Sequence, residues 1–153
     1  MLATVFVYGT LMPGHLRWGL IAPFATSSRK TQVAGELYDT GRGWPAARFA
    51  APLGVPALAR PVIAGDAGLG AGIPGWLVEL APSSAATLMS QLDEVEGAVL
   101  GEAVEPVGTG APAADYRRVR VSTIDGVEAW AYEGLVVEDG WQRVPSWSSL
   151  DEN

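Results

Sequence analysis

The chain of 153 residues contains no cysteine and only one histidine, His15. Without cysteine it can form no disulfide, thiolate zinc site, iron–sulfur cluster or cysteine nucleophile. A single histidine leaves no partner for a histidine metal centre or relay, so we expect no metal ion and interpret His15 as a surface or capping residue. We also expect a single domain over residues 1–153, because a chain of about 150 residues buries a sufficient core without such cross-links.

Positive charge is also scarce. Charged residues make up 18% of the chain, below the usual share of about 25%, and the formal net charge is −7. Residues 1–78 carry a net charge of +3 and residues 79–153 a net charge of −10. Binding to a nucleic-acid backbone requires a basic surface, so we expect no nucleic-acid partner.

Long hydrophobic runs are absent as well. No stretch approaches the roughly 20 consecutive apolar residues that cross a bilayer, and the first apolar run stops at Gly9. No basic region precedes that run, as one would in a signal peptide. The sequence therefore predicts a cytoplasmic protein with no membrane partner.

Glycine and proline, in contrast, are abundant, with 19 and 11 residues, and they divide the chain into short elements. The predicted strands are 3–8, 30–39, 41–49, 73–80, 116–124 and 127–133, and the predicted helices are 15–24 and 83–96. Two long loops are predicted at 50–72 and 98–114, and the first of them contains one short predicted strand at 60–64. Strands joined mostly by turns predict an α+β fold, a small mixed β-barrel or sheet flanked by a few helices.

The pattern of apolar residues predicts which faces of two of these elements are buried. In the helix predicted at 83–96, Leu88, Leu92 and Val95 share one stripe, which we expect to be buried. The strand predicted at 73–80 is nearly continuous in apolar residues, so we expect burial on both of its faces.

The late hairpin is defined by its turn, Asp125-Gly126, a strong signal for two paired strands. Counting from the turn places Val119 on the face that packs inward, and Tyr116 and Tyr132 on the opposite face. We expect these phenols to lie at a pocket edge, where at least one hydroxyl donates to the ligand; otherwise both are ordinary surface residues.

Two further patterns suggest sites but have simpler explanations. Gly70–Gly75 fits the dinucleotide-binding pattern G-x-G-x-x-G, but it contains Pro74 and precedes a predicted strand, so we interpret it as a loop and expect no cofactor. Arg117, Arg118 and Arg120 are interpreted as a solvated or ion-paired face rather than an anion site, because acidic residues dominate this half of the chain.

The segment Tyr8-Gly9-Thr10-Leu11 directly follows the first predicted strand. A strand that ends in a glycine turn exposes successive backbone N–H groups, and such groups can bind an anion without a cationic side chain. The alternative is a plain turn that ends a strand.

Glu96 is the last residue of the predicted helix. The helix dipole is negative at this end, so a carboxylate is disfavoured here, and partial burial would add to that effect. Both influences raise a carboxyl pKa toward the range of a useful acid–base group. The alternative is one more solvated acid in an acidic half of the chain.

Several short blocks together resemble the gamma-glutamylcyclotransferase-like (AIG2-like) family. They are Val5–Leu11 with its Y-G-T-L turn, Gly35–Gly41 followed by Trp44-Pro45-Ala46, Leu92–Gly97 as L-D-x-x-E-G, Tyr116-Arg117-Arg118, and Ala129–Tyr132. The order of the blocks spans most of the chain. The chain departs from the family in the greater length of loops 50–72 and 98–114, and in Pro145-Ser146-Trp147, which replaces a Gly-polar-Trp block.

The resemblance implies a small barrel with a pocket at its mouth, and an intramolecular reaction that converts a γ-glutamyl group to 5-oxoproline and releases an amine or amino acid. It implies Glu96 as the catalytic acid–base. It also implies a substrate-binding role for the residues that match the family's turn and late strands: Tyr8, Gly9, Thr10, Leu11, Tyr116 and Tyr132. We therefore expect a small γ-glutamyl substrate, no cofactor, and a monomer or weak homodimer.

Two other classes of function compete with an enzyme. A binding module on the same fold could hold a small metabolite without turnover, although a binder of anions gains nothing from Glu96 in its pocket. An interaction protein could use the tryptophans of its tail, Trp141 and Trp147, which are more often packed against their own domain.

Overall fold

The computed structural model describes residues 2–15, 17–41, 43–50, 52–53, 72–96, 98–100, 116–134 and 140–144. The elements in this part of the chain are β1 (Thr4–Val7), the 3-10 turns η1 (Trp18–Leu20) and η2 (Ala22–Phe24), β2 (Ala25–Asp39), β3 (Pro45–Phe49), β4 (Gly72–Leu80), α1 (Ala85–Glu96), β5 (Ala98–Leu100), β6 (Tyr116–Ser122), β7 (Glu128–Gly134) and β8 (Gln142–Val144). None of the described helices is long and apolar enough to cross a membrane.

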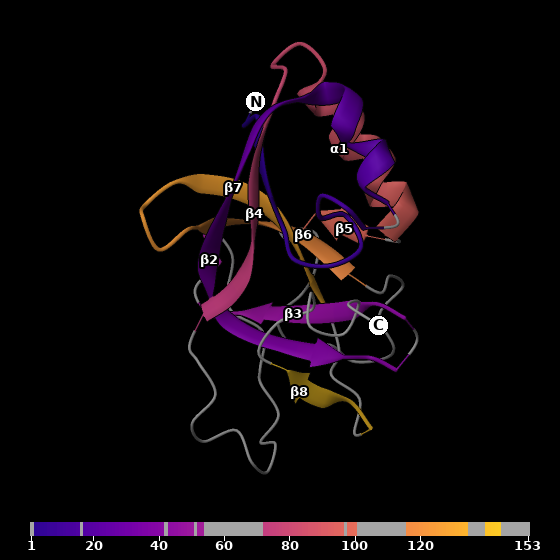
Figure 1. Cartoon of the computed structure of the whole chain (residues 1–153), viewed down its shortest axis with the longest axis vertical. Coiled ribbons are helices and arrows are strands. Elements are labelled where there is room, and N and C mark those ends of the chain that lie inside the picture. Colours follow the sequence, from indigo (N-terminus) through magenta and orange to yellow (C-terminus); the bar gives the residue numbers. More distant parts are fainter. Residues whose placement is uncertain are drawn as a thin grey trace.

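The strands form one mixed sheet in the order β3-β2-β4-β1-β7-β6-β5, and β8 pairs with β2 (Figure 1). The β1–β7 and β5–β6 pairs are parallel, and the other pairs are antiparallel. The sheet curls into a nearly closed barrel, since β3 at one end of the order returns to β7: the Phe49 amide donates to Glu133 Oε2 at 2.7 Å. The expected α+β barrel flanked by a few helices is confirmed.

The long strand β2 makes the curl possible by serving two parts of the sheet. Ala25–Ala34 pairs with β4, whereas Gly35–Asp39 pairs with β3, and its last three residues, Leu37–Asp39, also pair with β8 on the other side. Figure 1 shows β2 passing from the part of the sheet that contains β4 into the part that contains β3 and β8. At the transition, a Cβ on Gly35 would lie 2.3 Å from the Arg48 carbonyl oxygen, so only glycine permits this approach of β3.

The core lies inside the curl and under α1. The rings of Phe6, Tyr8 and Phe49 pack against one another with centroids 6.1–6.5 Å apart. The buried stripe of α1 is Ala85, Leu88, Met89 and Leu92. Burial of Leu88 and Leu92 is confirmed, but the expectation for Val95 is wrong, because it is 41% exposed and the helical period passes from Leu92 to Glu96 instead.

A buried ion pair lies where β3, β6 and β7 meet. The Arg117 guanidinium contacts Glu133 Oε1 at 2.6 Å, and each side chain is 1% exposed. Arg118 pairs with Asp93 and Arg120 with Glu128, so the ion-paired interpretation of these three arginines is confirmed.

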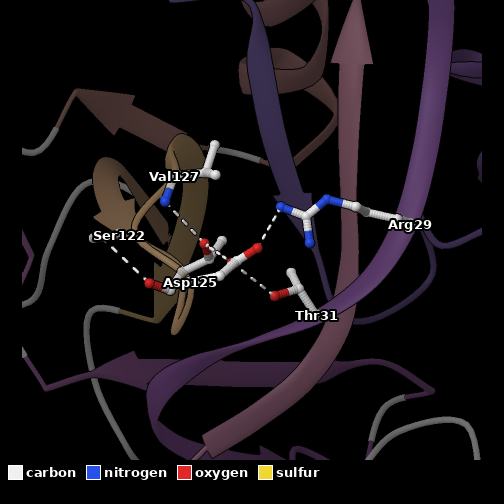
Figure 2. Close-up of polar contacts among 6 residues, drawn as sticks. Arg29, Thr31, Ser122, Asp125 and Val127 are labelled. Carbon is white, nitrogen blue, oxygen red and sulfur yellow. Dashed lines mark hydrogen bonds and ion pairs between the residues drawn. The ribbon is translucent and has the colours of Figure 1, made fainter.

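The predicted hairpin forms with the expected faces, but its strands end at Ser122 and begin again at Glu128, so the loop is longer than Asp125-Gly126. The register pairs Val119 with Ala131 and Arg118 with Tyr132. Figure 2 shows how the turn is held, with Asp125 paired to Arg29 of β2 at 2.6 Å. Asp125 also accepts from the Thr123 hydroxyl. The hairpin tip is thereby fixed to the first half of β2.

Several predicted boundaries and one predicted helix are wrong. Where one helix is predicted at 15–24, the described residues form two 3-10 turns, Trp18–Leu20 and Ala22–Phe24, and Pro23 has no N–H to continue an α-helical ladder. Strand β2 begins at Ala25 rather than residue 30, since its first residues are polar and exposed and show no apolar alternation. Residues 98–100 form β5 instead of loop.

The strand expected at 73–80 is covered on both faces only in part. Leu77 and Val78, which point to opposite faces, are both buried, whereas Trp76 is partly exposed and Glu79 is exposed. Gly72 and Gly75 lie in this strand, so no helix N-terminus follows the glycine pattern. The strand expected at 60–64 lies outside the described residues, as do most of both predicted long loops.

Candidate active site

One pocket is lined by β1 and the turn after it, the start of β3, the end of α1 and the late hairpin. The empty space within it is about 360 Å³, a figure that includes space open to solvent. Its lining residues are Phe6, Val7, Tyr8, Gly9, Thr10, Leu11, Trp44, Pro45, Glu96, Tyr116 and Tyr132. All seven residues assigned to a site from the sequence thus line the same pocket, although they come from opposite ends of the chain.

The turn after β1 supplies backbone donors to this pocket. Its described hydrogen bonds run from the Met12 amide to the Gly9 carbonyl at 3.0 Å and from the Arg17 amide to the Thr10 carbonyl at 2.8 Å. Within the described residues, the amides of Gly9, Thr10 and Leu11 donate in none of these turn hydrogen bonds. These three residues line the pocket, and their N–H groups are not used by the hydrogen bonds of the turn.

Gly9 is needed for packing rather than for an unusual backbone angle. Its φ is not positive, unlike that of five other described glycines. A Cβ at this position would lie 2.7 Å from Pro45 Cγ and 2.8 Å from Pro45 Cδ. The turn therefore lies directly on the proline that forms part of the pocket wall.

Glu96 ends α1 with its side chain only 13% exposed. It lies four residues after the buried Leu92, so the helix directs it toward the covered side. Burial raises the pKa of the Glu96 carboxyl, and the neighbouring Arg17 opposes part of that rise. The Arg17 Nη1 atom is 3.8 Å from Glu96 Oε2.

Sequence reasoning missed Arg17. It belongs to the irregular segment before η1, where no periodicity directs a side chain, and its partner is 79 positions away along the chain. The only signal was its position a few residues beyond the Tyr8–Leu11 turn.

All three tyrosines of the pocket give their hydroxyl protons to protein acceptors. Tyr8 donates to the Tyr132 carbonyl at 2.6 Å, Tyr116 donates to the Pro45 carbonyl at 2.9 Å, and Tyr132 donates to Asp93 Oδ1 at 2.8 Å. Burial raises the pKa of both Tyr8 and Tyr132, so these phenols stay neutral. The hydroxyls therefore present lone pairs to a ligand, and the expected donation of a phenol proton to it is not what the geometry provides.

Asp93 connects α1 to the hairpin. Besides accepting from Tyr132, its Oδ1 atom lies 2.9 Å from Arg118 Nε. Arg118 is 7% exposed, and its guanidinium lies over the Trp130 ring at 4.3 Å. Asp93 precedes Glu96 by three residues, about one helical turn, so this contact holds the end of the helix that carries Glu96.

The pocket thus has two chemically different sides. The turn offers N–H donors, while Glu96 and the phenol oxygens offer acceptors. An α-amino acid group, with a carboxylate beside an ammonium, has the complementary pattern. The described residues contain no group of three or more side chains that could hold a metal ion.

Comparisons with known proteins agree with this arrangement. The sequence pattern of a family described as "Gamma-glutamyl cyclotransferase, AIG2-like" matches residues 5–148. Among curated proteins, none matches the chain at a significant level.

Solved structures share the fold at low sequence identity. An uncharacterised protein of Pyrococcus horikoshii has a TM-score of 0.56 and 17% identity, over 98% of this chain and 93% of that one. An AIG2-like protein of Mus musculus has a TM-score of 0.52 and 16% identity, over 95% and 87%. The allophanate hydrolase of Kluyveromyces lactis has a TM-score of 0.57 and 12% identity, over 98% of this chain and 21% of that one.

Proposed function

Because the chain belongs to the gamma-glutamyl cyclotransferase, AIG2-like family, we propose that it cyclises a γ-glutamyl group to 5-oxoproline and releases an amine or amino acid. The observation that carries the proposal is the position of Glu96, a largely buried carboxyl whose pKa is raised, in the pocket with the donor turn. A group with a pKa raised toward the working pH can both accept and return a proton.

The proposed reaction needs no protein nucleophile. Glu96 removes a proton from the α-ammonium of the substrate, and the resulting amine attacks the γ-carbonyl carbon. A C–N bond forms, the ring closes, and the bond from the γ-carbon to the leaving nitrogen breaks. Glu96 passes its proton to that nitrogen, which leaves as an amine. The attacking nitrogen still carries a second proton after the C–N bond has formed, and this proton passes through the regenerated Glu96 carboxylate to the released amine, which departs as an ammonium ion. Holding the γ-glutamyl chain folded can supply up to about 7–11 kcal/mol of such a barrier.

The other pocket groups have supporting roles in this proposal. The amides of Gly9, Thr10 and Leu11 donate either to the α-carboxylate or to the oxygen that becomes negative in the tetrahedral intermediate. The oxygens of Tyr8, Tyr116 and Tyr132 accept from the ammonium. Trp44, which is 37% exposed, lies at the pocket rim beside Pro45.

The test is release of 5-oxoproline from a panel of γ-glutamyl amides and γ-glutamyl amino acids. We expect turnover by the wild type and none by Glu96→Gln, which keeps the side-chain shape but cannot carry the proton. Glu94→Gln is the matched control, because Glu94 lies two positions earlier on the same helix and is exposed. Turnover by Glu96→Gln close to the wild-type rate would contradict the proposal.

A metabolite-binding module is the second candidate. Binding of a γ-glutamyl compound with the same affinity by wild type and Glu96→Gln, without any 5-oxoproline, would favour it. The raised pKa of Glu96 favours the enzyme, because a carboxyl kept out of water has a use in proton transfer.

A further inference from the structure

Arg17 is the cationic side chain that contacts Glu96 in the described part of the chain. Its guanidinium is 3.8 Å from the carboxylate, longer than a hydrogen bond, and the side chain is 34% exposed. Its backbone is held at the site, because its amide donates to the Thr10 carbonyl. The guanidinium therefore has a fixed base and lies beside the pocket carboxyl, and about a third of its side chain is exposed, although Arg17 itself is not among the residues that line the pocket.

The chemistry at Glu96 determines what comes close to Arg17. To protonate the leaving nitrogen, Glu96 must come within about 3 Å of it. A carboxylate on the carbon attached to that nitrogen is only two bonds away. Such a carboxylate therefore lies within reach of a guanidinium that is itself 3.8 Å from Glu96. A planar guanidinium can bind it with two parallel hydrogen bonds.

The neighbouring arginine is unsuited to this task. Arg118 is 7% exposed and is held by Asp93 and by the Trp130 ring. Within the described residues, Arg17 is the cationic side chain in contact with Glu96, so it is the one placed to offset a second carboxylate on the ligand there.

From this geometry we infer that Arg17 binds a carboxylate on the leaving amine, and that the substrates are γ-glutamyl amides of amino acids or peptides rather than of simple amines. The inference rests on the proposed cyclotransferase function. It makes Arg17 a specificity-determining residue, which acts on the part of the substrate that leaves.

The experiment compares two substrates that differ only in this carboxylate, γ-glutamyl-alanine and γ-glutamyl-ethylamine. Wild type, Arg17→Gln and Arg17→Lys are assayed for 5-oxoproline release. Arg29→Gln is the control for removal of a positive charge, because Arg29 pairs with Asp125 on the hairpin tip (Figure 2), whereas Arg17 contacts Glu96.

We expect the wild type to prefer γ-glutamyl-alanine, and Arg17→Gln to lower that preference in kcat/KM about tenfold, the lower end of the range for hydrogen bonds to charged groups. Arg17→Lys should recover part of the preference, and Arg29→Gln should leave it unchanged. With either substrate, Arg17→Gln should also move the acidic limb of the pH profile of kcat/KM to higher pH. The reason is that loss of the cation lets the pKa of Glu96 rise further, while the reaction needs its ionised form.

Two outcomes overturn the inference alone. One is a wild type that does not distinguish the two substrates. The other is an Arg17→Gln variant that loses the same factor on both, because Arg17 would then serve Glu96 or the shared γ-glutamyl part. A wild type that releases 5-oxoproline from neither substrate, nor from any member of the wider panel, refutes the proposed function and the inference together.

Discussion

Replacing Tyr132 by phenylalanine distinguishes a hydroxyl that serves the fold from one that serves the ligand. The hydroxyl donates to the charged acceptor Asp93 at 2.8 Å, and hydrogen bonds to charged groups contribute about 1.5–3 kcal/mol. Asp93 keeps its contact with Arg118 and its side chain is 20% exposed, so water can replace part of the lost bond. We therefore expect the lower end, about 1.5 kcal/mol of lost stability.

For a chain of about 150 residues, that loss corresponds to a fall in Tm of roughly 3–6 °C, measurable by calorimetry or circular dichroism. The effect on kcat/KM should stay below about tenfold, because the ligand loses at most a neutral acceptor. A double-mutant cycle with Asp93→Asn should show coupling between the two residues. An unchanged Tm together with a much larger loss of kcat/KM would refute the reasoning. The Tyr132 hydroxyl would then donate to the ligand rather than to Asp93.

Two further predictions concern the pocket wall and the closure of the barrel. Gly9→Ala should displace Pro45 and raise KM, whereas Gly19→Ala, where a Cβ meets nothing within 4 Å, should not; equal KM values for both variants would contradict the packing role of Gly9. Glu133→Gln should lower the free energy of unfolding by about 3–5 kcal/mol in urea titrations, because it leaves Arg117 buried without its counter-charge; a loss below about 1 kcal/mol would contradict this.

Local patterns in the sequence predicted a large part of this architecture. The Asp125-Gly126 signal predicted the hairpin and which side chains share a face, such as Val119 with Ala131. It did not predict the loop length, because the Thr123 amide donates to the Val127 carbonyl and leaves three residues, 124–126, in the loop. The helical period gave the covered side of α1, and the position of Glu96 at its end followed from the same period. The error at Val95 arose because two stripes of similar apolarity are possible, and only tertiary packing selects between them.

Contacts between distant segments could not be predicted in this way. The phenol of Tyr116 donates to the carbonyl of Pro45, and nothing near either residue in the sequence indicates the other. The same holds for Arg17 beside Glu96 and for Asp93 beside Tyr132. The sequence identified which residues share a site, but the direction of each hydroxyl proton depends on acceptors that only the folded barrel brings close.

Because Glu96 is the last residue of α1, the number of residues in this helix determines the direction in which the Glu96 side chain points. Each residue of an α-helix turns the chain by about 100°, so one residue inserted or deleted between Ala85 and Glu96 would turn the carboxyl away from the pocket by about that angle. The exposed Glu94 or Val95 side of the helix end would then face the turn after β1. Functional relatives should therefore keep the number of residues between the start of this helix and its terminal glutamate constant, whatever happens to their loops.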